Sequence, residues 1–498
     1  MRARWIGVGV CALVFGVALV LLRGTPVAGS DQGIVLSVAA RMVDGDRLYS
    51  EVIENKDPLF FYAAATAFGI GGWRGPFVLD GIWLGLAGLS FALLLRELRA
   101  PRSAVVAGFF VYPLALTSGW YQAGLTMIAA LAIAPLVALF WLRGRFATSG
   151  ALLGAVMLFK LNLAPVAAGP LAAFVALGAP SGSRRRQVAW AAVGLAGALA
   201  VVAASLAAQG ALRAYLDTIS YNLHYANALL GSDSTFGRMA EHFEIVIDDF
   251  RLSGRWQLPA ALLVLAVFAV AVYFAVTRYA SRRRLLAATA VAAVIATLGT
   301  LALTAYWSHH LQMLAYPAAF VAATLISVVA SSFGRRAGAV AAAVCVLFAL
   351  WSSVKNEDRL DVSPAWTTTP HSGGAVALED ARKRFYAGSE RVSYMVFGGN
   401  SENAHAAFIG EGFDLVCRWF HLYPVSLDEQ FEETRECSER EDPMLILITL
   451  GFFDERAAPP AWKAFVADAR HLLDAEYGLV ETEHPGFQVF KRRAPVET

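Results

Sequence analysis

Repeated apolar runs constrain the fold of this chain more than any other feature, because each is long enough to cross a lipid bilayer as a helix. They fall at 6–22, 76–95, 103–118, 120–142, 187–209, 257–277, 285–305, 311–332 and 337–352. Of the 498 residues, 57% are hydrophobic and 16% charged, and the mean hydropathy of +0.53 is far from that of an ordinary soluble domain. The stretch 147–179 is apolar but short for two crossings, and we interpret it as a hairpin of broken or tilted helices. Residues 1–352 are therefore predicted to form an all-α polytopic membrane domain.

Arginine position orients these predicted spans. Under the positive-inside rule, arginines that flank spans or lie in short gaps between them are cytoplasmic. Counting from a cytoplasmic N-terminus gives about eleven crossings and leaves the loop 24–75, the segment 210–256, the turn 306–310 and the tail outside. The inner arginines are then Arg2, Arg4, Arg96, Arg99, Arg102, Arg143, Arg145, Arg184, Arg185, Arg186, Arg282, Arg283, Arg284, Arg335 and Arg336.

Two readings compete for residues 1–29. A positively charged start, an apolar core and small residues at 25–30 also fit a cleaved signal peptide. We favour a retained span, because the predicted topology needs this crossing to keep the arginine clusters on the inner side of the membrane. The net charge of only +2 gives no basic field that would indicate nucleic-acid binding.

The tail 353–498 is a different kind of sequence. Charged residues become common, and short buried strands are predicted at Val392–Phe397, Met444–Leu450 and Phe487–Phe490. Trp462–Tyr477 has apolar residues at helical spacing. The tail is therefore predicted to be an extracytoplasmic α/β domain of about 130 residues, large enough for its own core.

Cys417 and Cys437 are the cysteines that lie outside the predicted spans, among four in the chain. An oxidising exterior would allow them to pair across a loop of about twenty residues, which contributes roughly 3 kcal/mol. The alternative is two unrelated buried thiols. Cys11 and Cys345 are interpreted as small core residues of membrane helices.

Nucleotide-binding and common hydrolase motifs are missing from the sequence in any supporting context: there is no Walker loop, GxGxxG, HExxH, CxxC or GxSxG. Four polar features remain, and the predicted topology puts all of them at the outer membrane face. They are the loop that follows Asp31, Lys160, the segment Tyr215–Asn227, and the run Trp307–Gln312. Residues distant in sequence would thus line one site at the lipid–water boundary.

These features resemble the GT-C membrane glycosyltransferases, most closely the protein-mannosyltransferase and aminoarabinose-transferase branch. An acidic residue, Asp31, follows the first span, a turn runs from Gly45 to Tyr49, and a Lys-x-Pro-Leu-aromatic run covers Lys56–Tyr62. Gly154–Lys160 resembles a later helix of that family, and Trp307–Pro317 resembles its segment before a late span. The resemblance covers residues 6–330 in order and sidedness.

The resemblance implies a sugar donor linked to polyprenyl phosphate, attacked at the outer face by an acceptor hydroxyl of the cell envelope. Transfer with inversion needs a carboxylate to take the acceptor's proton, and a cation near the departing phosphate. Asp31 is the candidate general base. Its alternative role is an N-cap of the helical pattern that follows it, and the two roles are compatible.

Lys56, Lys160, His309 and His310 are the candidates for the phosphate side, with Tyr49 and Gln312 as further substrate-binding residues. Each has a structural alternative: an exposed ion pair with Asp57 for Lys56, snorkelling for Lys160, and a hydrogen-bonded pair at a helix start for the histidines.

Two glutamines stand where relatives often carry acids, Gln32 after Asp31 and Gln122 at the outer start of a span. A site of clustered carboxylates is therefore disfavoured, and we expect chemistry without a metal or other cofactor, with a divalent cation as the alternative. Asp44 is the second catalytic candidate, although Asp44-Gly45-Asp46 also has the composition of a turn, which we favour.

Two other classes of function stay open. A transporter or flippase for lipid-linked glycans would show internal repeats and discontinuous helices around a midplane site, and no convincing repeat is present. A non-catalytic envelope scaffold would make Asp31 expendable. The expected location is a bacterial plasma membrane, crossed many times, with the N-terminus inside. The expected partners are the donor lipid, membrane lipids and a glycan, lipid or protein acceptor, without nucleic acid.

Overall fold

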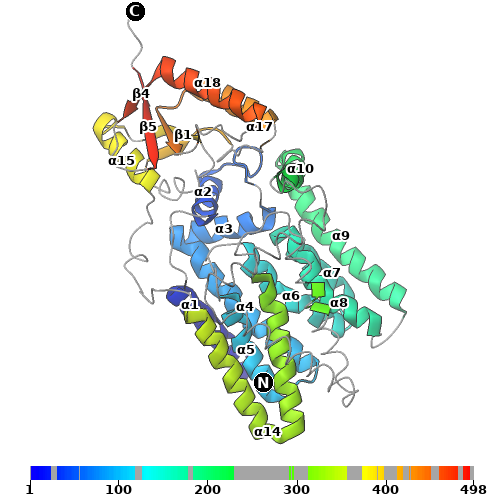
Figure 1. Ribbon diagram of the computed structural model, residues 1–498. Coiled ribbons are helices and arrows are strands. Elements are labelled where there is room, and N and C mark those ends of the chain that lie inside the picture. Colours follow the sequence, from blue (N-terminus) through cyan, green and yellow to red (C-terminus); the bar gives the residue numbers. More distant parts are fainter. Residues whose placement is uncertain are drawn as a thin grey trace, which may run out of the picture.

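The computed structural model describes residues 2–23, 31–54, 56–117, 126–177, 183–228, 291–292, 294–295, 312–355, 373–389, 391–397, 412–418, 426, 428–449, 452, 459–480 and 486–493. A bundle of helices occupies one end of the molecule, and an α/β unit (373–493) occupies the other (Figure 1). The N-terminus lies at the bundle end and the C-terminus at the α/β end.

The bundle consists mainly of apolar helices. Three helical stretches among the described ranges are long and apolar enough to cross a membrane: Pro58–Glu97, Arg184–Ala208 and Gln312–Ser353. Shorter apolar helices accompany them, and the predicted spans 257–277 and 285–305 lie almost entirely outside the described residues, so about eleven crossings remains an expectation. The helices are α1 (Arg2–Arg23), α2 (Asp31–Asp44), α3 (Pro58–Gly71), η1 (Gly72–Arg74), α4 (Gly75–Glu97), α5 (Arg102–Leu116), α6 (Thr126–Leu142), α7 (Phe146–Phe159), η2 (Leu161–Leu163), α8 (Ala164–Leu177), α9 (Arg184–Ala208), α10 (Leu212–Ala228) and α14 (Ala315–Lys355).

Glycine and an extended lysine break the longest apolar stretches. Gly72, at φ 59°, separates α3 from α4, and Gly334, at φ 88°, bends α14 between the two predicted spans 311–332 and 337–352. Lys160 is extended (φ −163°, ψ 104°) and separates α7 from η2 and α8. The described part of the stretch 147–179 is therefore broken into separate helices at Lys160, as its length predicted.

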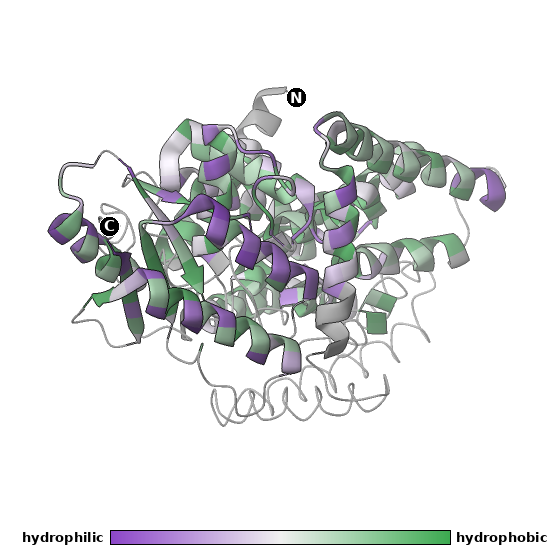
Figure 2. Cartoon of the chain, turned by 90° about the horizontal axis from the view of Figure 1, so that it is seen from above, coloured by the Kyte–Doolittle hydropathy of each residue, from purple (hydrophilic) through white to green (hydrophobic). Residues whose placement is uncertain are grey.

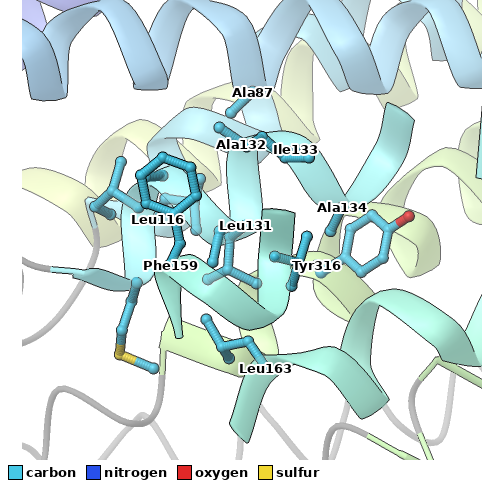
Figure 3. Packing of buried hydrophobic residues seen from close by; sticks show 14 of the residues in the cluster. Ala87, Leu116, Leu131, Ala132, Ile133, Ala134, Phe159, Leu163 and Tyr316 are labelled. Carbon is cyan, nitrogen blue, oxygen red and sulfur yellow. The ribbon is translucent and has the colours of Figure 1, made fainter. Parts of the chain in front are cut away.

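The bundle core is aromatic and aliphatic (Figure 3). Pro135 inside α6 has no N–H, so it leaves the carbonyl of Leu131 without its usual helical partner. The hydroxyl of Tyr112 on α5 donates to that carbonyl at 2.7 Å, and the hydroxyl of Ser90 on α4 donates to the neighbouring carbonyl of Ala132 at 3.0 Å. Neighbouring helices thus satisfy the backbone that the proline leaves open.

Helices α1 and α4 approach closely through glycine. A Cβ added to Gly16 would lie 2.0 Å from the carbonyl oxygen of Gly81, and one added to Gly85 would lie 2.4 Å from that of Ala12. Small residues at such a contact allow two backbones to meet, as in other membrane helix pairs.

The α/β unit is built on a five-stranded sheet of order β2-β1-β3-β5-β4. Strand β1 runs parallel to β2 and β3, while β5 runs antiparallel to β3 and β4. Its elements are α15 (Gly373–Phe385), β1 (Val392–Phe397), β2 (Phe413–Leu415), α17 (Asp428–Glu441), β3 (Leu445–Thr449), α18 (Pro460–Glu476), β4 (Tyr477–Val480) and β5 (Phe487–Arg492).

Alternating residues of the central strands supply two separate cores. Val392, Tyr394 and Leu447 face α15, while Met395, Phe397 and neighbours on β3 face α17 and α18. Figure 2 looks down on the molecule from above. The helices of the α/β unit carry both hydrophilic and hydrophobic residues, as expected of helices that bury one face.

Helix α14 is the last described element of the bundle, and α15 is the first of the α/β unit. Helix α14 continues to Lys355, three residues past 352, and α15 begins at Gly373. The predicted external loop 24–75 contains two helices, α2 and α3, which lie between the bundle and the α/β unit (Figure 1).

Candidate functional site

The loop between α2 and α3 folds around a buried tyrosine. An isolated bridge joins Leu48 to Val52, and the backbone N–H of Tyr49 donates to the carbonyl of Val52 at 2.7 Å. Tyr49 has φ 69°, which turns the chain and buries its ring completely. Its hydroxyl donates to the carbonyl of Lys56 at 2.7 Å. Tyr49 therefore fixes the backbone that carries Lys56.

Lys56 forms an ion pair inside this loop. Its Nζ lies 2.8 Å from Oε1 of Glu54, and the two side chains are 15% and 1% exposed. Oε2 of Glu54 is buried and has no hydrogen-bond partner among the described residues. A buried carboxylate oxygen without a partner is costly and rare.

Asp57 joins three segments that are distant in sequence. Its Oδ2 accepts the backbone N–H of Leu161 at 2.8 Å, and its Oδ1 accepts the hydroxyl of Tyr215 at 3.2 Å. The rings of Tyr215 and Tyr49 are 5.0 Å apart. The α2–α3 loop, the α7–α8 break after Lys160 and helix α10 thus converge on one carboxylate. We define the loop cluster as Tyr49, Glu54, Lys56, Asp57, Lys160 and Tyr215.

The electrostatics of the loop cluster are set mainly by burial. Burial raises the pKa of Asp57 above its ordinary value, although the Leu161 N–H, the Tyr215 hydroxyl and the charge of Lys160 act in the opposite direction. Burial, and then the negative charge of Asp57, raise the pKa of Tyr49 and Tyr215. Both tyrosines therefore stay neutral hydrogen-bond donors at physiological pH.

The structure brings together three of the residues predicted for the site, Tyr49, Lys56 and Lys160. Lys56 pairs with Glu54 two residues upstream and is largely buried, so the alternative of an exposed pair with Asp57 does not describe it. The backbone of Asp31 begins α2, and its side chain lies outside the described part of the structure. His309, His310 and Gln122 also lie outside the described residues.

Two further candidates are placed elsewhere. Asp44 ends α2 with a side chain 67% exposed, and its Oδ2 lies 3.9 Å from Arg391 of the α/β unit. Gln312 is buried just before α14, and its amide atoms have no hydrogen-bond partner within the described ranges. Asp44 thus faces the α/β unit and is not part of the loop cluster.

Sequence reasoning did not name Glu54 or Asp57 as site residues, and it marked Tyr215 only as the start of the polar segment Tyr215–Asn227. A signal for Asp57 was present, because it precedes Pro58 at the start of α3, and a residue before proline is held extended. The structure gives it φ −76° and ψ 151° and no side-chain cap to its own helix. Its carboxylate is thereby available to other segments. No comparable local signal marks Glu54.

Other grooves and clusters are separate from this site. No group of three or more metal-ligating side chains occurs among the described residues. A surface groove of about 590 Å³ lies between the first turns of α7 and α9, lined by Arg145, Arg186 and Trp190 among others. It is at the opposite end of α7 from Lys160.

Comparison with known proteins identifies the fold. No protein-family model and no curated protein sequence matches the chain. ArnT from Cupriavidus metallidurans bound to undecaprenyl phosphate is similar in structure, with a TM-score of 0.56, 14% identity and 99% of each chain covered. The archaeal oligosaccharyltransferase AglB from Archaeoglobus fulgidus, in complex with an inhibitory peptide and a dolichol-phosphate, has a TM-score of 0.51 and 13% identity, with 100% of this chain and 75% of AglB covered. The chain therefore shares the fold of ArnT and AglB, which agrees with the fold expected from its resemblance to the GT-C membrane glycosyltransferases.

Proposed function

We propose that this protein is a membrane glycosyltransferase that moves a sugar from a polyprenyl-phosphate-linked donor to an acceptor of the cell envelope at the outer membrane face. The observation that carries the proposal is the loop cluster, in which Lys56 and Lys160 come from separate segments to one place. The fold supports it, because similarity to ArnT, whose structure holds undecaprenyl phosphate, extends over both chains almost completely.

The proposed reaction is a displacement at the anomeric carbon of the donor sugar. The acceptor hydroxyl attacks that carbon, the bond from the carbon to the phosphate oxygen breaks, and the acceptor's proton passes to Asp31. Polyprenyl phosphate leaves with its negative charge balanced by Lys56 and Lys160, with His309 and His310 as further candidates. Attack from the face opposite the phosphate inverts the anomeric configuration.

Neighbouring groups of the loop cluster prepare the two lysines for this role. Tyr49 holds the backbone of Lys56 through its hydroxyl, and Asp57 ties the lysine-bearing α7–α8 break to the loop through the N–H of Leu161. Fixed cations cost no reorganisation when charge develops on the leaving phosphate. No metal ion or organic cofactor is part of this proposal.

The function is tested with the full-length protein in lipid nanodiscs. Undecaprenyl phosphate carrying radiolabelled mannose or arabinose is the donor, and envelope extract supplies acceptors. Label that moves from lipid to acceptor, with release of undecaprenyl phosphate, is the expected result. Movement of intact labelled lipid across a proteoliposome membrane without glycosyl product would instead show a flippase. Binding of glycans by the isolated membrane protein with neither activity would show a scaffold.

A further inference from the structure

The α/β unit contacts the polypeptide that leads into the loop cluster. Arg41, in the last turn of α2, donates through Nη1 to the carbonyl of Cys417 at 3.2 Å and through Nη2 to the carbonyl of Glu51 at 2.9 Å. Its Nε pairs with Asp46. One planar guanidinium thus joins three segments: the end of α2, the loop that follows it, and the α/β unit.

A backbone hydrogen bond continues this junction toward the site. The N–H of Ile53 donates to the carbonyl of Arg418 at 2.9 Å. Ile53 directly precedes Glu54, and Glu54 holds Lys56. The α/β unit is therefore one hydrogen bond and one residue away from the carboxylate that positions a proposed phosphate-binding lysine.

The contacting segment Val416–Arg418 is itself held rigidly. It follows the edge strand β2, and the N–H of Val416 donates to Tyr394 of β1 at 3.0 Å. Cys417, in the left-handed region at φ 69°, is bridged to Cys437 of α17. Arg418 forms an ion pair with Glu433 of the same helix. Two side-chain links to α17 hold a backbone conformation that a residue with a Cβ rarely adopts on its own.

We propose that the disulfide-fixed segment Val416–Arg418 of the α/β unit, acting through Arg41 and Ile53, positions the loop that carries Glu54 and Lys56, so that the tail is a working part of the transfer site. This inference rests on the proposed function. Arg41 is a positioning residue here, because it acts on Lys56 through the loop. The same helix α2 begins at Asp31, so Arg41 also fixes the register between the proposed base and the proposed phosphate side.

The test uses the full-length protein in nanodiscs and undecaprenyl phosphate itself as the probe. Binding is followed by native mass spectrometry, and hydrogen exchange is followed in peptides that cover 47–56. The variants are Arg41→Met and the double replacement Cys417→Ser with Cys437→Ser. Arg41→Met leaves the disulfide intact. If the serine variant does not fold, Arg41→Met alone tests the inference. The matched control is Arg47→Gln, since Arg47 is exposed and its described contacts are with Glu51 and Gln209, not with the α/β unit.

We expect both variants to bind undecaprenyl phosphate roughly tenfold more weakly and to exchange faster at 47–56, within the usual range of coupling between two sites. The control should match the unmodified protein in both measurements. Coupling is reciprocal, so undecaprenyl phosphate should slow exchange in the segment 413–418 of the unmodified protein. A lower melting temperature alone, with unchanged binding and exchange at 47–56, would overturn the inference and leave a purely structural contact.

Failure of the inference is distinguishable from failure of the proposed function. Absence of undecaprenyl phosphate binding by the unmodified protein would count against the function. Faster exchange at 47–56 in the variants would then still support mechanical coupling of the two parts, and unchanged exchange would reject it.

Discussion

Asp57 carries its carboxylate where burial makes the charged form costly. An aspartate whose folded-state pKa is raised binds its proton more tightly in the folded than in the unfolded chain. Its contribution to stability therefore falls as pH rises through the folded pKa, and the cost of the buried charge is fully present at neutral pH. The cost is absent below the ordinary aspartate pKa of about 4.

Asp57→Asn removes this charge and keeps one carbonyl oxygen that can accept from the Leu161 N–H, while the amide nitrogen in place of Oδ1 can donate to the Tyr215 hydroxyl oxygen. We expect the variant to melt at a higher temperature than the unmodified protein at pH 7, with the difference shrinking as pH falls toward 4. Thermal unfolding in nanodiscs across that range measures it. Asp57→Ala, which removes the acceptor as well, should lose the gain. A less stable Asn variant at pH 7 would show that the ionised carboxylate stabilises the fold.

Asp31→Asn tests the proposed base. Asparagine has nearly the same size as aspartate and caps a helix about as well, so the protein should fold and bind undecaprenyl phosphate normally. The rate of transfer should fall on the order of a hundredfold or more, the usual scale for a positioned general base. Single-turnover transfer of a labelled sugar gives the rate. Near-normal transfer would remove Asp31 from the mechanism, and Asp44 would be tested next.

Residue identity alone predicted part of the site. Lys56 stands in a recognisable Lys-x-Pro-Leu run, and Lys160 interrupts an apolar stretch, so both were visible in the sequence. Glu54 becomes a site residue through its ion pair with Lys56 two residues later in the chain, and Tyr215 through its tertiary contact with Asp57. The local sequence around a charged residue or a tyrosine in a polar segment does not show whether that residue belongs to a site or to the ordinary protein surface.

Helices of the bundle satisfy each other's backbone where proline interrupts them. Tyr112→Phe removes the donor to the Leu131 carbonyl that Pro135 leaves open, so a buried acceptor loses its partner. We expect a loss of about 1–3 kcal/mol of unfolding free energy, measured by denaturant or thermal unfolding in a mild detergent. Tyr316→Phe is the matched control, because the hydroxyl of Tyr316 is buried with no partner among the described residues. Equal losses for the two variants would contradict this role of Tyr112.

Element boundaries followed the sequence where glycine or proline sets them. The strand Val392–Phe397 lies where it was predicted, directly before Gly398 and Gly399. Helix α3 was missed, because its apolar residues precede a predicted span and read as part of a loop. Tyr477 was assigned to a helix but begins β4, since helical spacing does not show where pairing with β5 takes over.

The whole molecule has the fold of ArnT at only 14% identity. That fold was predicted from the apolar runs of spanning length and from the polar segments that connect them, because few backbone structures can cross a bilayer. The docking of the α/β unit onto the α2–α3 loop was not predictable, because Arg41 and Cys417 are 376 residues apart and form their contact only in the folded chain.

The orientation of the molecule in the membrane is the remaining prediction at this scale. The C-terminal end of α7 meets the α2–α3 loop through Leu161 and Asp57, so the first turn of α7 lies at the end of that helix away from the loop cluster, and arginines at that end should be cytoplasmic. Cysteine is introduced at the exposed positions of Ala387→Cys or Thr148→Cys, with Cys11 and Cys345 replaced by serine and the disulfide retained. A membrane-impermeant maleimide should label Ala387→Cys in intact spheroplasts and Thr148→Cys only in inverted vesicles. The opposite pattern would place the loop cluster on the inner face, where the site would meet cytoplasmic substrates and the proposed reaction at the outer face would be excluded.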